Sequence, residues 1–184
     1  RDNGVWAAML KMPHVELNTT GIEAFTPEGI LTKDGVLHAV NVVICATGFK
    51  ASDFLAPMKI TGTGGRELHR DCWDGDCRAY LGISVPDFPN LFMTTGPNGP
   101  AALANIIRIS ENDVDWIASA IEHMAKNKQT AMEPTSQAEE GWMTVVATLS
   151  KRSLLNKAKT WYLGANVPGK PRVFMPYPGG FLRY

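Results

Sequence analysis

The stretch "VNVVICATGFK", residues 40–50, constrains the fold more than any other part of this sequence. Its centre, Val42–Cys45, is apolar on both faces, which is typical of an interior strand in a covered, parallel sheet. The strand stops at Ala46-Thr47-Gly48-Phe49, where a glycine lets the backbone approach a neighbour closely. The stretch predicts a buried strand, with Cys45 packed inside it, whose end is either an ordinary turn or a contact with a flat, polar ligand.

A second stretch repeats this arrangement. "NLFMTT", residues 90–95, predicts another interior strand, which ends in "GPNGP" and continues into a short helix within "PAALANIIRI". Ligands of open parallel sheets bind outside the carboxyl ends of the strands, and the start of a helix favours an anionic oxygen or a ring nitrogen. The two strand ends together favour a shared ligand as strongly as they favour two plain turns.

Short strands are predicted before residue 40, and loops dominate residues 50–89. The strands are expected at Val15–Leu17, at Ile22–Phe25, and at Gly29–Thr32 and Val36–Val40, with a hairpin turn at Lys33-Asp34-Gly35 between the last two.

Two amphipathic helices follow. Ser110 is expected to cap the first, with Asp113 at its third position and an apolar face of Val114, Ile117, Ala118, Ile121 and Met124. Ser136 and Glu139 predict a capping box for the second, with an apolar face of Trp142, Val145, Val146 and Leu149. Both apolar faces are expected to point into the core.

Composition and motifs exclude several classes of protein. Lys+Arg and Asp+Glu number 18 each, so the net charge of zero does not indicate a nucleic-acid or anionic-membrane surface. No apolar run approaches the ~20 residues that span a bilayer. The three cysteines form no disulfide framework, which fits a reducing, cytoplasmic compartment. His69, Cys72 and Cys77 match no common zinc spacing, so no metal site is expected.

"WYLGANVPGK", residues 161–170, is a coil with an aromatic pair and two specified turns, which is more typical of a functional loop than of a connector. Two hypotheses fit Trp161. Its indole N–H could hold a ribose or a carbonyl, or its ring could close the core.

Taken in order, these stretches resemble the C-terminal part of a Baeyer–Villiger monooxygenase. "ATGF" is shared with other flavoproteins that bind two dinucleotides, whereas "GPNGP" followed by "WYLGANVPGK" is specific to this family. The resemblance covers almost the whole chain. It implies an α/β fold that is part of a Rossmann-like FAD/NADP flavoprotein. Residues 1–40 would leave the NADP domain, 41–109 would form the second half of the FAD domain, and 110–184 a helical and coil C-terminal segment.

The resemblance also implies site residues and a reaction. FAD would be contacted by Ala46, Thr47, Gly48, Phe49, Gly96, Pro97 and Asn98, and the nicotinamide ribose of NADP by Trp161. The ketone pocket would be lined by Ala102, Leu103, Ala104, Asn105 and Ile106. The catalytic arginine is expected upstream of Arg1, so this chain would supply no catalytic residue. NADPH reduces FAD, dioxygen adds at the flavin C4a, and the resulting peroxyflavin converts a ketone to an ester or lactone.

The family's glycine motifs for FAD and NADP are absent from these residues, so a complementary N-terminal polypeptide is expected as a partner. The family usually has an acid where this chain has Asn41. Two alternatives remain at this point: a flavin monooxygenase that oxidises nitrogen or sulfur, and a non-catalytic fragment that only binds its partner.

Overall fold

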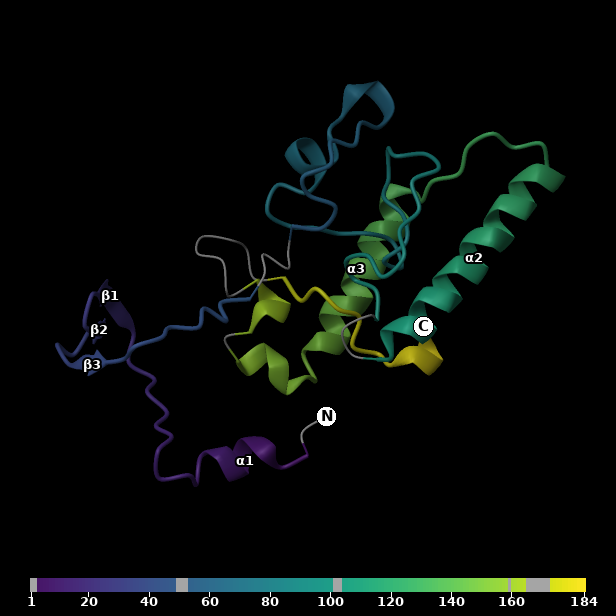
Figure 1. Ribbon diagram of the computed structural model, residues 1–184. Helices are drawn as coiled ribbons and strands as arrows, with labels where there is room; N and C mark the ends of the chain where they lie inside the picture. The colour runs from purple at the N-terminus through teal and green to yellow at the C-terminus, as the bar shows by residue number, and fades with distance from the viewer. Residues whose placement is uncertain (1–2, 49–52, 101–103, 159, 165–172) are drawn as a thin grey trace. The chain divides into compact units, whose positions relative to one another are not determined.

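The computed structural model, shown in Figure 1, describes residues 3–48, 53–100, 104–158, 160–164 and 173–184. The chain divides into two compact units, Arg1–Gly48 and Phe49–Tyr184. The predicted boundaries after residues 40 and 109 stay a prediction, because a compact unit of this chain need not be a domain of a longer flavoprotein.

The first unit contains a short helix and a small antiparallel sheet. Helix α1 spans Val5–Met9, and strands β1 (Ile22–Thr26), β2 (Gly29–Thr32) and β3 (Leu37–Ala39) pair in the order β1-β2-β3. The predicted hairpin turn is confirmed: Gly35 has a φ of 82°, and its N–H donates to the Thr32 carbonyl at 2.9 Å. The strand predicted at Val15–Leu17 is wrong, because these residues have no regular structure.

The predicted interior strand at Val42–Cys45 is also wrong in this structure. Residues 41–48 form no strand and are exposed; Val42 is 75% and Ile44 86% accessible. Cys45 is exposed rather than packed. A strand requires a hydrogen-bonded neighbour, and the part of the chain that the structure describes provides none for this segment.

The second predicted interior strand, Asn90–Thr95, is not formed either. Asn90 and Thr95 adopt left-handed backbone, with φ of 63° and 54°, so the extended run is broken at both ends. Between them, Met93 is buried and its N–H donates to the Ile83 carbonyl at 2.8 Å. Helices and a small sheet agree with the predicted α/β class, but the sheet found among the described residues is antiparallel.

Both long helices form, with starts that differ from the prediction. Helix α2 spans Ile106–Lys126 and is capped by Asn105, whose side chain accepts from the N–H groups of Ile107 and Arg108. The predicted cap, Ser110, instead donates to the Ile106 carbonyl inside the helix. Asparagine is as strong a cap as serine, so the earlier residue starts the helix.

Helix α3 spans Ser136–Ser150 and is capped by Thr135, one residue before the predicted cap. Its predicted apolar face is largely confirmed, because Val146 is buried and Trp142 and Leu149 pack around it, although Val145 is 43% exposed. The predicted face of α2 is wrong: Val114 and Ile121 are each 53% exposed. The buried side chains of α2 are Ile109, Asp113 and Ala120.

Apart from the face of α3, the core of the second unit is built largely on irregular backbone that the sequence patterns did not predict to be a core. One buried cluster comes from the coil before α2 and contains Leu68, Trp73, Ala79, Val85, Phe88 and Met93. A second cluster joins α3 to the C-terminal coil through Val146, Leu163, Phe174 and Tyr177. None of the helices in the described ranges is both long and apolar enough to cross a bilayer.

Candidate functional site

The predicted cofactor loop Gly96-Pro97-Asn98, called the Gly-Pro-Asn loop below, lies buried within the second unit. Asn98 is fully buried, and the protein satisfies its polar groups. Its side-chain oxygen accepts from Ala79 N–H at 3.1 Å, its N–H donates to the Met175 carbonyl at 2.7 Å, and its carbonyl accepts from Trp142 Nε1 at 3.2 Å. Asn98 therefore holds the loop in place.

Gly96 is required by packing inside the chain. A Cβ at this position would lie 2.4 Å from the Gly82 carbonyl oxygen, which is closer than real Cβ contacts. The Gly96 N–H also donates to that oxygen, at 3.1 Å. Gly82 follows Leu81, and both have left-handed backbone. The turn at Leu81–Gly82 thus fixes the backbone at the start of the Gly-Pro-Asn loop. The sequence predicted only a cofactor contact for Gly96, whereas the structure gives it a packing role.

Trp161 begins a short turn of 3₁₀-helix, η5 (Trp161–Leu163), which ends at the left-handed Gly164. The residue is 43% exposed, and its ring lies 4.1 Å from the Tyr162 ring, centroid to centroid. Leu163, at 7% exposure, fills the core in its place. The hypothesis that Trp161 closes the core is therefore wrong, and its indole is accessible for a ligand.

Two backbone hydrogen bonds connect the turn of Trp161 to the Gly-Pro-Asn loop. Met175 N–H donates to the Tyr162 carbonyl at 2.9 Å, and the Met175 carbonyl accepts from Asn98 N–H at 2.7 Å. Two segments that the sequence separates by more than 60 residues are thus each hydrogen-bonded to Met175. The structure brings the predicted NADP contact and one predicted FAD contact together through Met175.

The segment predicted to line the ketone pocket contains the start of α2. Ala104, Asn105 and Ile106 are all exposed, while Ala102 and Leu103 lie outside the described residues. The first turn of α2 carries no acidic side chain, and Ile106 is 56% exposed. An open helix start without a carboxylate presents partial positive charge next to an apolar side chain.

The predicted FAD contacts Ala46, Thr47 and Gly48 lie in the exposed segment of the first unit, and Phe49 lies outside the described residues. Gly48 has a φ of 77°, and a Cβ there would meet nothing within 4 Å. The left-handed backbone is enough to explain a glycine at this position. A close approach of the Gly48 backbone to a cofactor stays a prediction.

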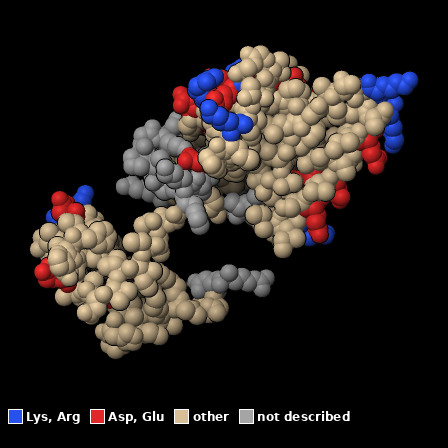
Figure 2. Space-filling model, turned by 45° about the horizontal axis from the view of Figure 1, so that its top comes forward, with Lys and Arg blue, Asp and Glu red and all other residues tan. Residues whose placement is uncertain are grey.

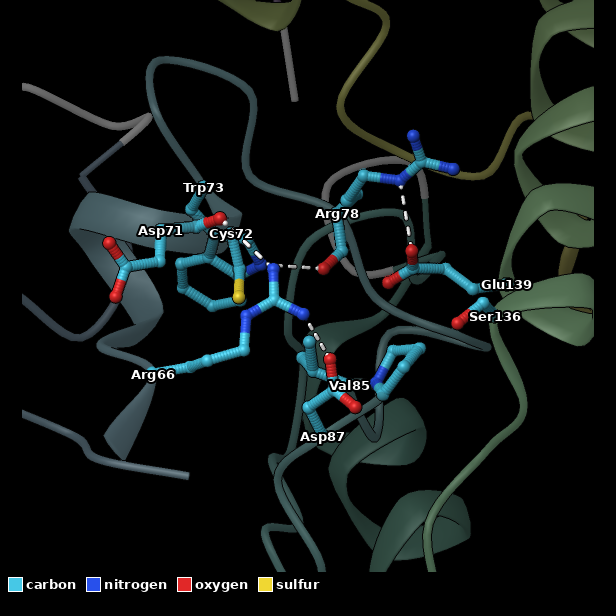
Figure 3. A pocket seen from close by; sticks show the side chains of 10 residues that line it. Arg66, Asp71, Cys72, Trp73, Arg78, Val85, Asp87, Ser136 and Glu139 are labelled. Carbon is cyan, nitrogen blue, oxygen red and sulfur yellow. Dashed lines mark hydrogen bonds and ion pairs between the residues drawn. The ribbon is translucent and has the colours of Figure 1, made fainter. Parts of the chain in front are cut away.

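An open pocket of about 230 Å³, shown in Figure 3, lies apart from these predicted residues, between the coil at 66–87 and the start of α3. Its two arginines are already paired. Arg66 forms an ion pair with Asp87, and Arg78 Nε lies 3.1 Å from Glu139 Oε2, at an angle that does not make a hydrogen bond. The Arg78 carbonyl accepts from Trp73 Nε1 at 2.7 Å.

The charges of this pocket are used to hold the coil together. Burial raises the pKa of the Glu139 carboxyl and of the nearby Asp76 carboxyl, and Arg78 opposes both shifts. Since the arginines already have carboxylate partners, the pocket offers no unpaired cation to a phosphate. Among the described residues, no group of three His, Cys, Asp or Glu side chains could hold a metal ion.

Known proteins resemble this chain along its whole length. The acetone monooxygenase (methyl acetate-forming) of Gordonia sp. (strain TY-5) is 36% identical over 186 residues, which cover 100% of this chain and 33% of that protein. A Baeyer–Villiger monooxygenase of Pseudooceanicola batsensis is 39% identical over 89% of this chain and 30% of its own length. A phenazine N-monooxygenase of Lysobacter antibioticus is 33% identical over 92% of this chain and 31% of its own length.

Solved structures agree with these relatives. The crystal structure of cyclohexanone monooxygenase from Rhodococcus sp. Phi1, bound to NADP⁺, matches 97% of this chain with a TM-score of 0.82 and 37% sequence identity. The match covers 34% of that protein. No protein-family model matches the chain. The chain spans about a third of the length of these relatives, and it is homologous to the C-terminal portion of Baeyer–Villiger monooxygenases.

Proposed function

We propose that this chain is the C-terminal portion of an FAD- and NADPH-dependent monooxygenase that converts ketones to esters or lactones. The observation that carries the proposal is the match of sequence and fold over 97% of the chain to a cyclohexanone monooxygenase bound to NADP⁺. Fold alone would not establish a reaction. The exposed indole of Trp161 and the open start of α2 support the same activity from the chain's own side chains.

The residues present fit a flavin in three respects. The first turn of α2 carries no carboxylate, so the positive end of the helix dipole suits an electron-rich carbonyl or ring nitrogen. Beside it, Ile106 is 56% exposed, so apolar surface is available for a flat ring. The Gly-Pro-Asn loop contributes rigid backbone, because Asn98 is bound on three sides by the protein.

In this proposal, FAD supplies the oxygen chemistry when bound, and NADPH supplies the hydride. The chain's own residues bind the cofactors and orient them and the ketone. Trp161 holds the nicotinamide ribose through its indole N–H, and Asn105 keeps the first turn of α2 in register while Ile106 excludes water from the ketone. The proton transfers and the charge stabilisation at the reacting atoms are assigned to residues of the preceding portion.

A product assay tests the proposed reaction. The complete flavoprotein is incubated with NADPH, ¹⁸O-labelled dioxygen, and acetone or cyclohexanone. We expect one labelled oxygen atom in the ester or lactone and the second in water, for each NADPH consumed. Consumption of NADPH with only hydrogen peroxide as product, for every ketone tried, would reject the proposal.

Oxidation of a heteroaromatic nitrogen is the second candidate, because a relative named as a phenazine N-monooxygenase matches 92% of the chain. The same assay with phenazine in place of the ketone separates the two reactions. An N-oxide formed faster than any ester would favour this second candidate.

We further propose that a preceding portion of the flavoprotein, carrying the glycine motifs for both dinucleotides, covers the apolar face of α2. This face is formed by Ile107, Val114 and Ile121, spaced seven residues apart, and they are 68%, 53% and 53% exposed. In Figure 2 the charged side chains of the larger unit gather in small mixed clusters, and other residues make up most of the surface between them. Such surface is typical of an interface within a protein. The compartment we propose is the cytoplasm.

This interface predicts that residues 1–184 alone expose apolar surface. We expect the isolated chain to bind the dye ANS strongly at neutral pH, whereas the complete flavoprotein binds little. Val114→Asp in the complete protein should raise ANS binding, because a charge would enter the interface. Ser119→Asp, on an exposed position of the same helix, serves as the control. Low ANS binding with a cooperative melt of the isolated chain would contradict this prediction.

A further inference from the structure

A carboxyl group lies on the buried face of α2, where an apolar side chain would be expected. Asp113 is 1% exposed, and its neighbours on this face, Ile109 and Ala120, are 0% and 8% exposed. Burying a carboxyl is costly unless hydrogen bonds compensate it. Asp113 is therefore expected to have a defined role in holding the surrounding backbone.

Asp113 accepts hydrogen bonds from two segments outside α2. Its Oδ2 accepts from the Thr95 N–H at 2.9 Å, and its Oδ1 accepts from the Tyr184 hydroxyl at 3.4 Å. Thr95 has a left-handed φ of 54° and immediately precedes the Gly-Pro-Asn loop. The carboxyl thus fixes the backbone at the point where the chain turns into this loop.

Tyr184 contacts the Leu81–Gly82 turn, which is hydrogen-bonded to the start of the same loop. Its hydroxyl also donates to the Leu81 carbonyl, in the turn whose Gly82 oxygen receives the Gly96 N–H. Its ring packs against Trp142 and Tyr177, with centroids 6.1 and 5.8 Å apart. Figure 1 shows the turn η6 (Phe181–Arg183), which leads to Tyr184, beside the first turns of α2.

Burial raises the pKa of both side chains. Burial, together with the neighbouring Asp113 carboxyl, raises the pKa of the Tyr184 hydroxyl, so that it remains a donor. Burial also raises the pKa of Asp113, and the Thr95 N–H and the Tyr184 hydroxyl oppose that shift. The Tyr184 hydroxyl donates to the Leu81 carbonyl, and its longer contact of 3.4 Å with Asp113 Oδ1 links the Leu81 turn to α2.

We propose that Asp113 and Tyr184 are positioning residues, which clamp the Gly-Pro-Asn loop from both sides in the conformation that receives FAD. The inference rests on the proposed function for its ligand, but the clamp itself consists only of this chain's own contacts. Neither residue touches the cofactor in this proposal. Both act through the backbone at Thr95 and at Leu81–Gly82.

The test compares variants of the complete flavoprotein. Asp113→Leu removes both carboxyl oxygens at similar size, whereas Asp113→Asn keeps a hydrogen-bonding group at each of the two positions. Its amide oxygen can accept from Thr95, and its NH₂ can donate to the Tyr184 oxygen while that hydroxyl still donates to Leu81. Tyr184→Phe keeps the ring packing but loses the hydroxyl. Tyr177→Phe is the matched control, because it removes a hydroxyl from the same aromatic cluster without touching Asp113.

Two measurements follow: amide hydrogen exchange of Thr95 in the apoprotein, and the Kd for FAD of the folded apoprotein. We expect Asp113→Leu to speed the exchange of Thr95 and to weaken FAD binding about tenfold. Tenfold corresponds to about 1.4 kcal/mol, which is within the range for leaving a partly buried N–H such as that of Thr95 unpaired. Tyr184→Phe should weaken binding less, and Asp113→Asn and Tyr177→Phe should resemble the parent.

Each other result counts against the clamp. Unchanged exchange of Thr95 in Asp113→Leu would overturn it even if the variant were less stable. Asparagine that fails as badly as leucine would show that charge, rather than hydrogen bonding, is what the site needs. If the parent apoprotein binds no FAD, the proposed function fails, while the exchange measurement still decides whether the clamp exists.

Discussion

Asn98→Ala is expected to destabilise the complete flavoprotein by about 3 kcal/mol and to reduce its FAD content. The substitution leaves the Ala79 N–H, which is fully buried, without its acceptor at 3.1 Å. An unpaired buried N–H costs about 1–3 kcal/mol, and the cavity left by the amide adds to that loss. Because the loop is then free to move, its backbone no longer presents one conformation to the flavin.

Urea unfolding followed by tryptophan fluorescence measures the loss of stability, and the ratio of flavin to protein absorbance measures FAD content. Asn90→Ala is the matched control. Its amide also bonds two backbone groups, the Thr130 carbonyl and the Met132 N–H, but at an exposed site. For that variant we expect a loss of stability of about 1 kcal/mol and a normal FAD content. Equal losses in the two variants would mean that Asn98 has no special relation to the cofactor.

Local signals in the sequence predicted local structure well. The hairpin at Lys33-Asp34-Gly35 follows from the turn chemistry of three adjacent residues, and it is confirmed. The strand at Val42–Cys45 failed for the opposite reason. Its apolar pattern specifies a buried environment, but the neighbours that would bury it are not among the described residues, where the segment is exposed.

The candidate site also shows that local patterns predict local features but not contacts between distant residues. The motif "GPNGP" located the loop, but no local pattern reveals that Asn98 bonds to Ala79 and Met175, which are 19 and 77 residues away. Asp113 did leave a signal that went unused. It falls on the same face of the helix as Ile109 and Ala120, and an acid within such a stripe indicates a buried partner. A cap at Ser110 would place Asp113 in the first turn of the helix, where an acid needs no buried partner.

Trp161→Ala is expected to change the products of the reaction more than the stability of the protein. The residue is 43% exposed, so removal of its ring loses mainly the contact with the Tyr162 ring, which is worth about 1 kcal/mol. If the indole holds the nicotinamide ribose, as we propose, its loss loosens NADP and admits water near the flavin. Reduced oxygen would then leave as hydrogen peroxide instead of entering the ketone.

Leu163→Ala, two residues along the same turn, provides the contrasting control. Leu163 is 7% exposed within the second core cluster, so its truncation should cost about 2–5 kcal/mol. The folded fraction of that variant should still couple NADPH consumption to ester formation. The pair therefore separates a ligand contact from a packing contact within a single turn of backbone.

The assay compares NADPH consumed, hydrogen peroxide released and ester formed, with the melting temperature of each variant. We expect Trp161→Ala to give more peroxide and less ester per NADPH, at a melting temperature close to that of the parent. Trp161→Phe should be partly impaired, because it keeps an aromatic ring but loses the N–H donor. Full coupling in Trp161→Ala would remove Trp161 from the NADP site. A large fall in its melting temperature would show that the half-exposed ring contributes far more to packing than its contact with Tyr162 indicates.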